Sequence, residues 1–316
     1  MVDVLYKLNN KLLNQNTDTK LKRKIRNGIF LLSLKLTNVV QPLIYSIQFN
    51  KYKLDDKEIK GKRGRKVIIS LTSFPARIDF LWLCIESLFR QSVQPDRIIL
   101  WLANSQFDGV ESLPKRLLEQ QKKGLIIKFC DDLRSHKKYF YSFKEYPSDV
   151  VITVDDDVFY PSNAIEKLIE LHRIYPNAIC CNRGHVIKLS KNNQIAPYEE
   201  WVNNNVKIEK PSLLLCPTGV GGVLYPPDSV HEEVFNEKNI KDLCFFADDI
   251  WLKFMSLKKR IKVVRSTDFP QALFTITPAQ KESLAKINVD NGKNDEQLKN
   301  LIDYYYNWDI FSGIDQ

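Results

Sequence analysis

Residues 150–161 read VVITVDDDVFYP, and this stretch decides the fold. Its first five residues are all β-branched, which predicts a buried strand over 150–154. Pro161 then opens a helix predicted to continue to Ile174, because proline is favoured in the first turn of a helix. A buried strand that leads through a short loop into a helix is typical of α/β domains.

Three aspartates form the loop after this strand. If the chain continues as a strand, Asp155 and Asp157 point to one side and Asp156 points to the other. Carboxylates crowded at the end of a buried strand are unfavourable unless a cation neutralises them, and their hard oxygen atoms favour Mg²⁺ or Mn²⁺. The outer pair can share such a cation, while Asp156 can bind a ribose or brace the loop. The alternative is a cluster that caps the helix or lies solvated in a turn.

Short β-rich runs alternate with helical patterns from residue 67 onwards, which predicts an α/β fold with a mostly parallel sheet and flanking helices. The predicted strands cover 67–71, 97–102, 125–130 and 150–154, and further helices cover 79–90, capped by Asp79, 113–121 and 138–145. Ligands of such sheets bind beyond the carboxyl ends of the strands. Residues 72–77, 131–138 and 155–157 are therefore expected to line one crevice.

A second acidic site lies in residues 245–252, which read FFADDIWL. Asp248 is expected to cap the helix that follows, and Asp249 to face the crevice, where a carboxylate can remove a proton from a hydroxyl group. A pair of carboxylates at the start of a helix is also explained by capping alone.

Glycines and basic residues complete the set of candidates. Residues 217–227 read PTGVGGVLYPP, and their glycines allow close approach of the backbone to a diphosphate or sugar, although a bulge or tight turn explains them as well. Lys137, Lys138 and Arg77 are placed to neutralise phosphate or to pair with the aspartates. Solvated loop charges are the alternative for each of them.

Composition and charge narrow the classes of function. The six cysteines form no Cys-x-x-Cys pair, and no signal peptide is evident at the N-terminus, so a cytoplasmic location is expected. The net charge of +9 belongs to residues 1–66, which carry +11, so the remaining 250 residues carry −2. The main part of the chain therefore lacks the basic excess of a nucleic-acid-binding protein.

The basic N-terminal arm contains an amphipathic pattern. An apolar stripe recurs at helical spacing and follows a basic cluster; it consists of Leu32, Leu36, Val39, Leu43 and Ile47. Polar residues interrupt the stretch, so a helix lying in a membrane interface is favoured over a spanning one, with peripheral contact through residues 20–49. A helix packed on its own domain or on a partner is the alternative. The predicted division is an arm over 1–60, including this helix, a main domain over 61–290, reached through the basic linker 61–66, and a tail over 291–316.

Seven segments of the chain carry a resemblance. They are SLTSFPAR at 70–77, ILWL at 99–102, SHKK at 135–138, TVDDD at 153–157, PTGVGG at 217–222, ADDIW at 247–251 and NDEQ at 294–297. Together they resemble the bacterial glycosyltransferases of the GT-A fold that build surface polysaccharides, including capsule and lipopolysaccharide. The resemblance covers most of the main domain. The sequence lacks the Gln-x-x-Arg-Trp element of processive synthases, and this favours a single-transfer hexosyltransferase.

The resemblance implies a nucleotide-sugar donor, with a UDP-sugar expected first, and inversion at the transferred sugar. It implies that Asp155 and Asp157 hold Mn²⁺ or Mg²⁺ and that Asp249, or secondly Asp248, is the catalytic base. The expected donor-binding residues are Thr72, Arg77, Asp132, Lys137, Lys138, Asp156, Gly221 and Gly222. The expected acceptor is a lipid-linked saccharide at the inner face of the cell membrane.

Two other functions compete with this interpretation. A nucleotidyltransferase that makes a nucleotide sugar predicts a glycine-rich loop with arginine after the first strand, but residues 72–77 contain no glycine. A nonenzymatic scaffold that binds a membrane or nucleic acid predicts basic residues spread over the domain surface.

Overall fold

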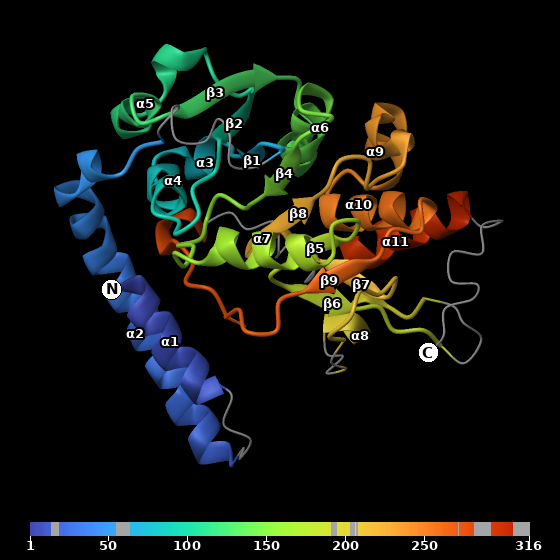
Figure 1. Cartoon of the computed structure of the whole chain (residues 1–316), viewed down its shortest axis with the longest axis horizontal. Coiled ribbons are helices and arrows are strands. Elements are labelled where there is room, and N and C mark those ends of the chain that lie inside the picture. The colour runs from blue at the N-terminus through green and yellow to red at the C-terminus, as the bar shows by residue number, and fades with distance from the viewer. Residues whose placement is uncertain are drawn as a thin grey trace.

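The computed structural model describes residues 1–13, 19–54, 64–190, 195–202, 206, 208–270, 272–280 and 292–305. Its centre is a seven-stranded sheet in the order β3-β2-β1-β4-β8-β5-β9, in which β8 runs antiparallel to both neighbours and the other pairs are parallel (Figure 1). The strands are β1 Val67–Thr72, β2 Arg97–Ala103, β3 Leu125–Cys130, β4 Val150–Thr153, β5 Ile179–Cys181, β8 Val223–Tyr225 and β9 Val263–Arg265. A small second sheet pairs β6 Gly184–Val186 with β7 Leu215–Pro217.

Helices cover both faces of the large sheet. On one face pack α4 Leu81–Phe89, α5 Lys115–Gln121 and α7 Ala164–Ile174, and on the other α6 Lys137–Glu145 and α10 Asp248–Lys258. The shorter helices are α3 Pro75–Ile78, α8 Tyr198–Val202 and α9 Glu237–Leu243. The α/β fold with a mostly parallel sheet and the four strands predicted at its N-terminal half are confirmed.

Two predicted helix starts are wrong. The helix predicted from Asp79 is split, because α3 ends at Ile78 and α4 begins at Leu81 without a side-chain cap. Pro161 lies three positions before the first residue of α7, Ala164, so it ends the acidic loop and does not open the helix.

Residues 293–304, predicted as part of the tail, form α11 Lys293–Tyr304. Leu298 and Leu301 of this helix are buried in the same apolar cluster as α10. The predicted boundary at residues 60 and 61, positions 61–63 of the predicted linker and positions 306–316 of the predicted tail lie outside the described residues.

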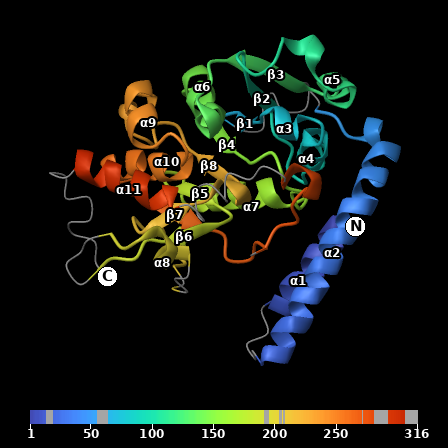
Figure 2. The same cartoon turned by 180° about the vertical axis from the view of Figure 1, so that it is seen from behind.

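The N-terminal arm forms a helical hairpin of α1 Val2–Leu13 and α2 Lys20–Ile47, which projects along one side of the domain (Figures 1 and 2). Its inner contacts are unusually polar. The Tyr6 hydroxyl donates to the Phe159 carbonyl at 2.7 Å and accepts from the Phe274 amide at 2.8 Å. The Asn38 side chain bonds the Thr275 carbonyl and the Thr277 amide. The hairpin is thereby fixed to the segments that surround the acidic loop.

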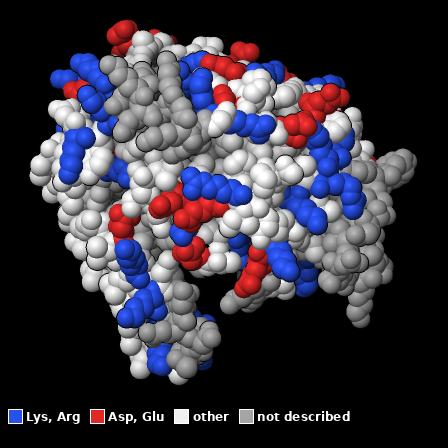
Figure 3. Space-filling view, viewed as in Figure 1, with Lys and Arg blue, Asp and Glu red and all other residues white. Residues whose placement is uncertain are grey.

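Lys and Arg alternate with Asp and Glu over the face of the main domain seen in Figure 3. A continuous basic surface, as a nucleic-acid-binding scaffold predicts, does not appear on this face.

Candidate active site

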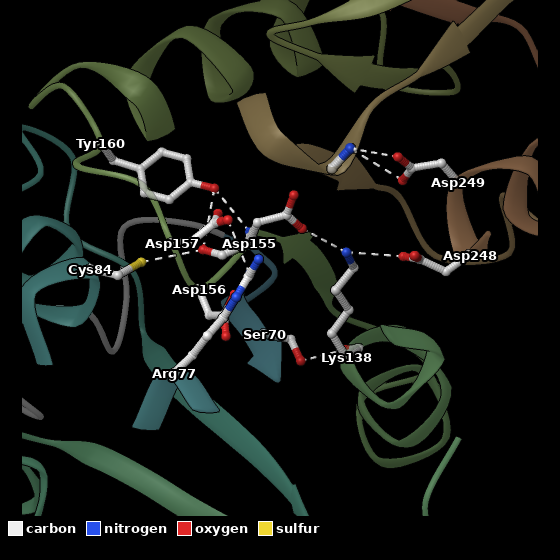
Figure 4. A network of polar contacts seen from close by, with 11 residues as sticks. Ser70, Arg77, Cys84, Lys138, Asp155, Asp156, Asp157, Tyr160, Asp248 and Asp249 are labelled. Carbon is white, nitrogen blue, oxygen red and sulfur yellow. Dashed lines mark hydrogen bonds and ion pairs between the residues drawn. The ribbon is translucent and has the colours of Figure 1, made fainter. Parts of the chain in front are cut away.

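The acidic loop leaves the sheet at the carboxyl end of β4, next to that of β1 (Figure 4). Asp155 Oδ1 forms an ion pair with Lys138 Nζ at 2.8 Å. Asp156 and Asp157 share one nitrogen of Arg77, Nη1, at 2.6 and 3.0 Å. The predicted alternation of the three side chains is therefore wrong, because β4 ends at Thr153 and the backbone bends after it.

Asp156 braces the loop, which was one of its two predicted roles. It is buried and accepts hydrogen bonds from Ser73 Oγ and from Arg77, both at 2.6 Å. Asp157 accepts a further hydrogen bond from Gln280 Nε2 at 2.7 Å. Burial and the neighbouring charge of Asp156 raise the pKa of Asp157 to about 6, against the opposite effect of Arg77. The loop thus holds more negative charge than Arg77 neutralises.

Lys138 joins the two acidic sites. From α6, its Nζ lies 2.8 Å from Asp155 and 3.0 Å from Asp248 at the start of α10. Burial lowers the pKa of Lys138, but the surrounding carboxylates raise it by a larger amount, so the pKa stands well above its ordinary value. Asp248 is not the expected cap, since the N-cap position is Ala247 and no side chain caps the helix.

Asp249 lies across from the acidic loop. Its two carboxylate oxygens accept hydrogen bonds from the Gly219 amide at 3.1 and 3.0 Å. Burial and the adjacent Asp248 raise the pKa of Asp249 to about 8, although Lys138 and the Gly219 amide act in the other direction. A carboxylate of this pKa is a strong base for a side chain of its kind when it is ionised.

Gly219 marks the point where these groups converge. A Cβ atom at this position would lie 2.9 Å from Asp155 Oδ1, 3.0 Å from Lys138 Nζ and 3.4 Å from Asp249 Oδ1. The three functional groups are therefore all within contact of one methyl-sized volume.

We expect Gly219→Ala to reduce kcat/KM at least tenfold, because the added methyl group must push apart Asp155 and Lys138. Overpacking of this kind costs about 1–3 kcal/mol, so the chain should still fold. The matched control is Gly28→Ala in α2, where a Cβ meets nothing within 4 Å. Steady-state kinetics measures the effect. Equal kcat/KM for Gly219→Ala and Gly28→Ala would contradict the claim that the three functional groups converge at Gly219.

Several predicted residues lie elsewhere. Lys137 points away from Lys138 and pairs with Asp132 at 2.7 Å, beyond β3. Burial raises the pKa of Asp132, but the hydrogen bond from Lys137 lowers it by more, so the pKa lies below its usual range. The Thr72 hydroxyl donates to the Trp101 carbonyl at 2.7 Å, so it joins β1 to β2.

Gly221 and Gly222 serve the backbone of the turn η4 Gly219–Gly221 that leads into β8. A Cβ atom at Gly221 would come within 2.8 Å of Arg183 Cβ, and Gly222 has a φ of +86°, which favours glycine. Their contact with a ligand stays a prediction, while Gly219 of the same segment lies between the two acidic sites.

Sequence reasoning missed Arg183, which follows β5. Burial lowers the pKa of Arg183, and the charges of Asp155 and Asp249 offset this only in part. The guanidinium group therefore interacts electrostatically with both acidic sites. A single arginine outside any of the quoted segments gave no signal for this position.

The charges and ligand types fit a divalent cation. Of the five carboxylates of Asp155–Asp157, Asp248 and Asp249, four form ion pairs in the described part of the chain, with Arg77 or Lys138. Among the described residues no group of three or more His, Cys, Asp or Glu side chains is arranged to hold a metal. Mg²⁺-like ions take one or two carboxylates together with substrate phosphates, and the Asp155 side chain, which is 30% exposed, is accessible for this role.

Residues 72–221 match the family model described as glycosyl transferase family 2. The match covers slightly less than half of the chain; it begins at the end of β1, includes the acidic loop, and ends in η4 at Gly221, so Asp248 and Asp249 lie beyond it. A search of curated proteins by sequence finds no match.

Solved structures with a similar fold include three of low sequence identity. A mannosyltransferase from Pyrobaculum calidifontis, in complex with GDP-Man and Mn²⁺, has a TM-score of 0.42 and 10% identity, and the alignment covers 75% of this chain and 65% of that one. TarS residues 1–349 from S. aureus give 0.43 and 13%, covering 78% and 74%. A 4-diphosphocytidyl-2C-methyl-D-erythritol synthase gives 0.38 and 11%, covering 65% and 90%. This chain thus spans less than two thirds of the mannosyltransferase.

Proposed function

We propose that the chain transfers a hexose from a nucleotide sugar, with a UDP-sugar as first choice, to a hydroxyl group of a saccharide acceptor, with inversion. The observation that supports this most is the convergence of Asp155, Lys138 and Asp249 around Gly219, beside a family 2 domain that contains two of the three elements. A base for the acceptor hydroxyl and a cationic group for the leaving diphosphate, both beside one small volume, are what displacement at a sugar carbon needs.

Asp249 is the proposed base. It takes the proton of the acceptor hydroxyl as that oxygen forms a bond to the anomeric carbon. The bond from that carbon to the diphosphate oxygen breaks on the opposite face, and its electron pair leaves with the diphosphate. Attack opposite to the leaving group inverts the configuration of the sugar.

Lys138 supports the departure of the diphosphate. An ammonium group has three N–H donors, and the contacts with Asp155 and Asp248 use two of them. The third remains for a phosphate oxygen on which negative charge develops. Asp155, whose side chain is 30% exposed, would hold Mn²⁺ or Mg²⁺, which supplies further positive charge for the donor diphosphate. Asp157, the second proposed ligand, would have to turn away from Arg77 to share the cation.

The proposed acceptor is a lipid-linked saccharide of surface polysaccharide synthesis, and the proposed location is the cytoplasmic face of the cell membrane. The support is the amphipathic arm, through which residues 20–49 make peripheral contact with the membrane. Tyr6 and Asn38 fix the arm to the segments beside the acidic loop, so an arm on the membrane would bring that loop to a membrane-bound substrate.

The pH dependence of kcat/KM follows from Asp249. The carboxyl group must be ionised to accept a proton, and its raised pKa of about 8 in the free enzyme leaves it mostly protonated at neutral pH. We therefore expect kcat/KM to rise almost tenfold per pH unit from pH 6 to about 8 and to level off above. A profile that is flat from pH 6 to 9 would exclude Asp249 as the base.

The transfer reaction itself is tested by product analysis. The chain is incubated with a panel of nucleotide sugars, Mn²⁺ and a polyprenyl-linked saccharide, and nucleotide products are separated by chromatography. The proposal predicts one nucleoside diphosphate released per sugar transferred, and NMR of the product shows the inverted anomer. Release of inorganic pyrophosphate from a nucleoside triphosphate and a sugar phosphate would instead identify a nucleotidyltransferase.

A further inference from the structure

The hairpin of α1 and α2 has its apolar residues on the outside. Of fifteen large hydrophobic side chains that are exposed among the described residues, eleven belong to residues 1–47. The predicted stripe of α2 is the most continuous part, with exposed fractions from 44% at Leu36 to 85% at Ile47. An apolar surface of this extent needs a partner, because water solvates it poorly.

The inner side of the same helix is mixed. Phe30 and Leu34 pack against the apolar core of the domain, whereas the fully buried residues are Ser33, Thr37, Gln41 and Tyr45. Between the helices, Asn9 of α1 donates to Ser33 Oγ at 3.0 Å. An exposed apolar stripe opposite a face that contains buried polar groups is unfavourable for a helix in water, and it is compatible with contact between the stripe and lipid.

Positive charge lies at both ends of the stripe. At the start of α2, the sequence KLKRKIR at 20–26 has five basic residues and no acidic one. Beyond its end, a groove of about 520 Å³ is lined by Lys53, Arg116, Lys122 and Lys123. Lys123 is paired with the buried Glu86 and Arg116 with Glu119, so Lys53 and Lys122 supply the positive charge at this end. In Figure 3 the projecting hairpin at lower left shows mainly white and blue side chains. An anionic lipid surface is complementary to this order of charge, apolar stripe and charge.

The second half of α2 is bonded to the domain and the first half projects from it (Figures 1 and 2), which favours docking over crossing. By length and hydropathy α2 alone is sufficient for a membrane span. However, Asn38 is bonded to Thr275 and Thr277, and Arg90 donates to Gln48 at 2.8 Å. A spanning helix would have to break these contacts.

We infer that the α1–α2 hairpin is a docking surface for an anionic lipid bilayer, in which the stripe enters the interface and the basic groups meet the phosphate headgroups. This deepens the proposed membrane location and rests on it, but it does not depend on the transfer reaction. Asn38 of α2 is bonded to Thr275, and Gln280, five positions further along the same segment, is bonded to Asp157 of the acidic loop. Docking of the hairpin therefore fixes the acidic loop close to the lipid surface.

The test is flotation of the full chain with vesicles of phosphatidylcholine alone or with phosphatidylglycerol, without donor or acceptor. We expect binding to the anionic vesicles and at least tenfold weaker partition of the double variant Leu36→Gln with Leu43→Gln. Arg23→Gln with Lys24→Gln should lose the preference for anionic vesicles. The matched control is Ile174→Gln, an exposed apolar residue of α7 in the main domain, which should bind like the wild type.

Three outcomes would overturn the inference. The wild type does not float with anionic vesicles, or the double stripe variant floats as well as the Ile174 control. Light scattering shows that the wild type is a dimer and the double stripe variant a monomer, while neither binds vesicles; this result assigns the apolar stripe to contact with a second copy of the chain. Bound chain resists an alkaline carbonate wash, which assigns α2 to a membrane span. Since substrates are absent, failure here leaves the transfer assay unaffected, and failure of transfer leaves lipid binding intact.

Discussion

Lys138→Met is expected to lower the free energy of unfolding by about 3–5 kcal/mol and to remove measurable transfer. Removal of one partner from a buried ionic cluster leaves its other members without compensation, which is the costly case for buried charges. Lys138 is 5% exposed and is the partner of both Asp155 and Asp248. Urea unfolding measures the loss.

The effect of Lys138→Met should depend on pH. Lys138 lowers the pKa of Asp249, so its removal raises that pKa further. A carboxyl group whose pKa is higher in the folded chain than in the unfolded chain favours folding when protonated, and this contribution is lost as pH rises. The deficit relative to the wild type should therefore grow above about pH 8, where Asp249 ionises in the wild type but stays protonated in the variant.

The matched control is Lys137→Met on the same helix. Lys137 is equally buried, but its partner Asp132 is 28% exposed and can be solvated once the lysine is gone, whereas Asp248 beside Lys138 is only 10% exposed. We expect a loss of about 1 kcal/mol and no pH-dependent deficit. Equal losses for both variants would show that Lys138 has no special part in the acidic cluster.

Asp249→Asn is expected to reduce kcat by about 10²–10⁴-fold, the range that a positioned general base supplies. Asparagine keeps an oxygen that can accept the hydrogen bond from the Gly219 amide, so the fold and donor binding should persist. Initial rates of nucleoside diphosphate release measure the effect. The rise of activity toward pH 8 should vanish in this variant.

Asp242→Asn serves as the control, because this exposed carboxylate of α9 pairs only with Lys238 in a surface contact. Its rate should remain within twofold of the wild type. If Asp249→Asn also stays within threefold, another group accepts the proton, and Asp248 is then the next candidate.

Sequence patterns predicted the sheet well where a strand is fully buried. The runs that became β1 to β4 are almost wholly apolar, and only such runs satisfy a parallel strand covered on both faces. The short strands β5, β8 and β9 were not predicted, because three apolar residues give no period that distinguishes them from loops.

The candidate residues were easier to predict than their arrangement. Strand ends predicted the segments of Asp155 and Lys138, and the acidic pair at the start of an apolar helix predicted Asp249; the structure brings the three side chains together. Their orientation was not predictable, because it depends on where β4 stops and on the 100° turn between adjacent residues of α6, which separates Lys137 from Lys138. Arg77 was predicted to pair with the aspartates, but the sequence did not indicate that it meets Asp156 and Asp157 rather than Asp155.

The hairpin shows a further limit of sequence patterns. The spacing of Leu32, Leu36 and Leu43 identified an amphipathic helix, but periodicity alone cannot say which face meets the domain. The polar contacts of Tyr6 and Asn38 decide it, and they depend on backbone groups of distant segments.

The central claim is that the acidic loop and Lys138 bind the diphosphate of a nucleotide donor. Calorimetric titration of the chain with uridine diphosphate in the presence of Mn²⁺ tests it most directly. The account predicts saturable binding of one nucleotide per chain, weakened at least tenfold when Mn²⁺ is removed and in Asp155→Asn. No binding of any nucleoside diphosphate, or equal binding by Asp155→Asn, would contradict it.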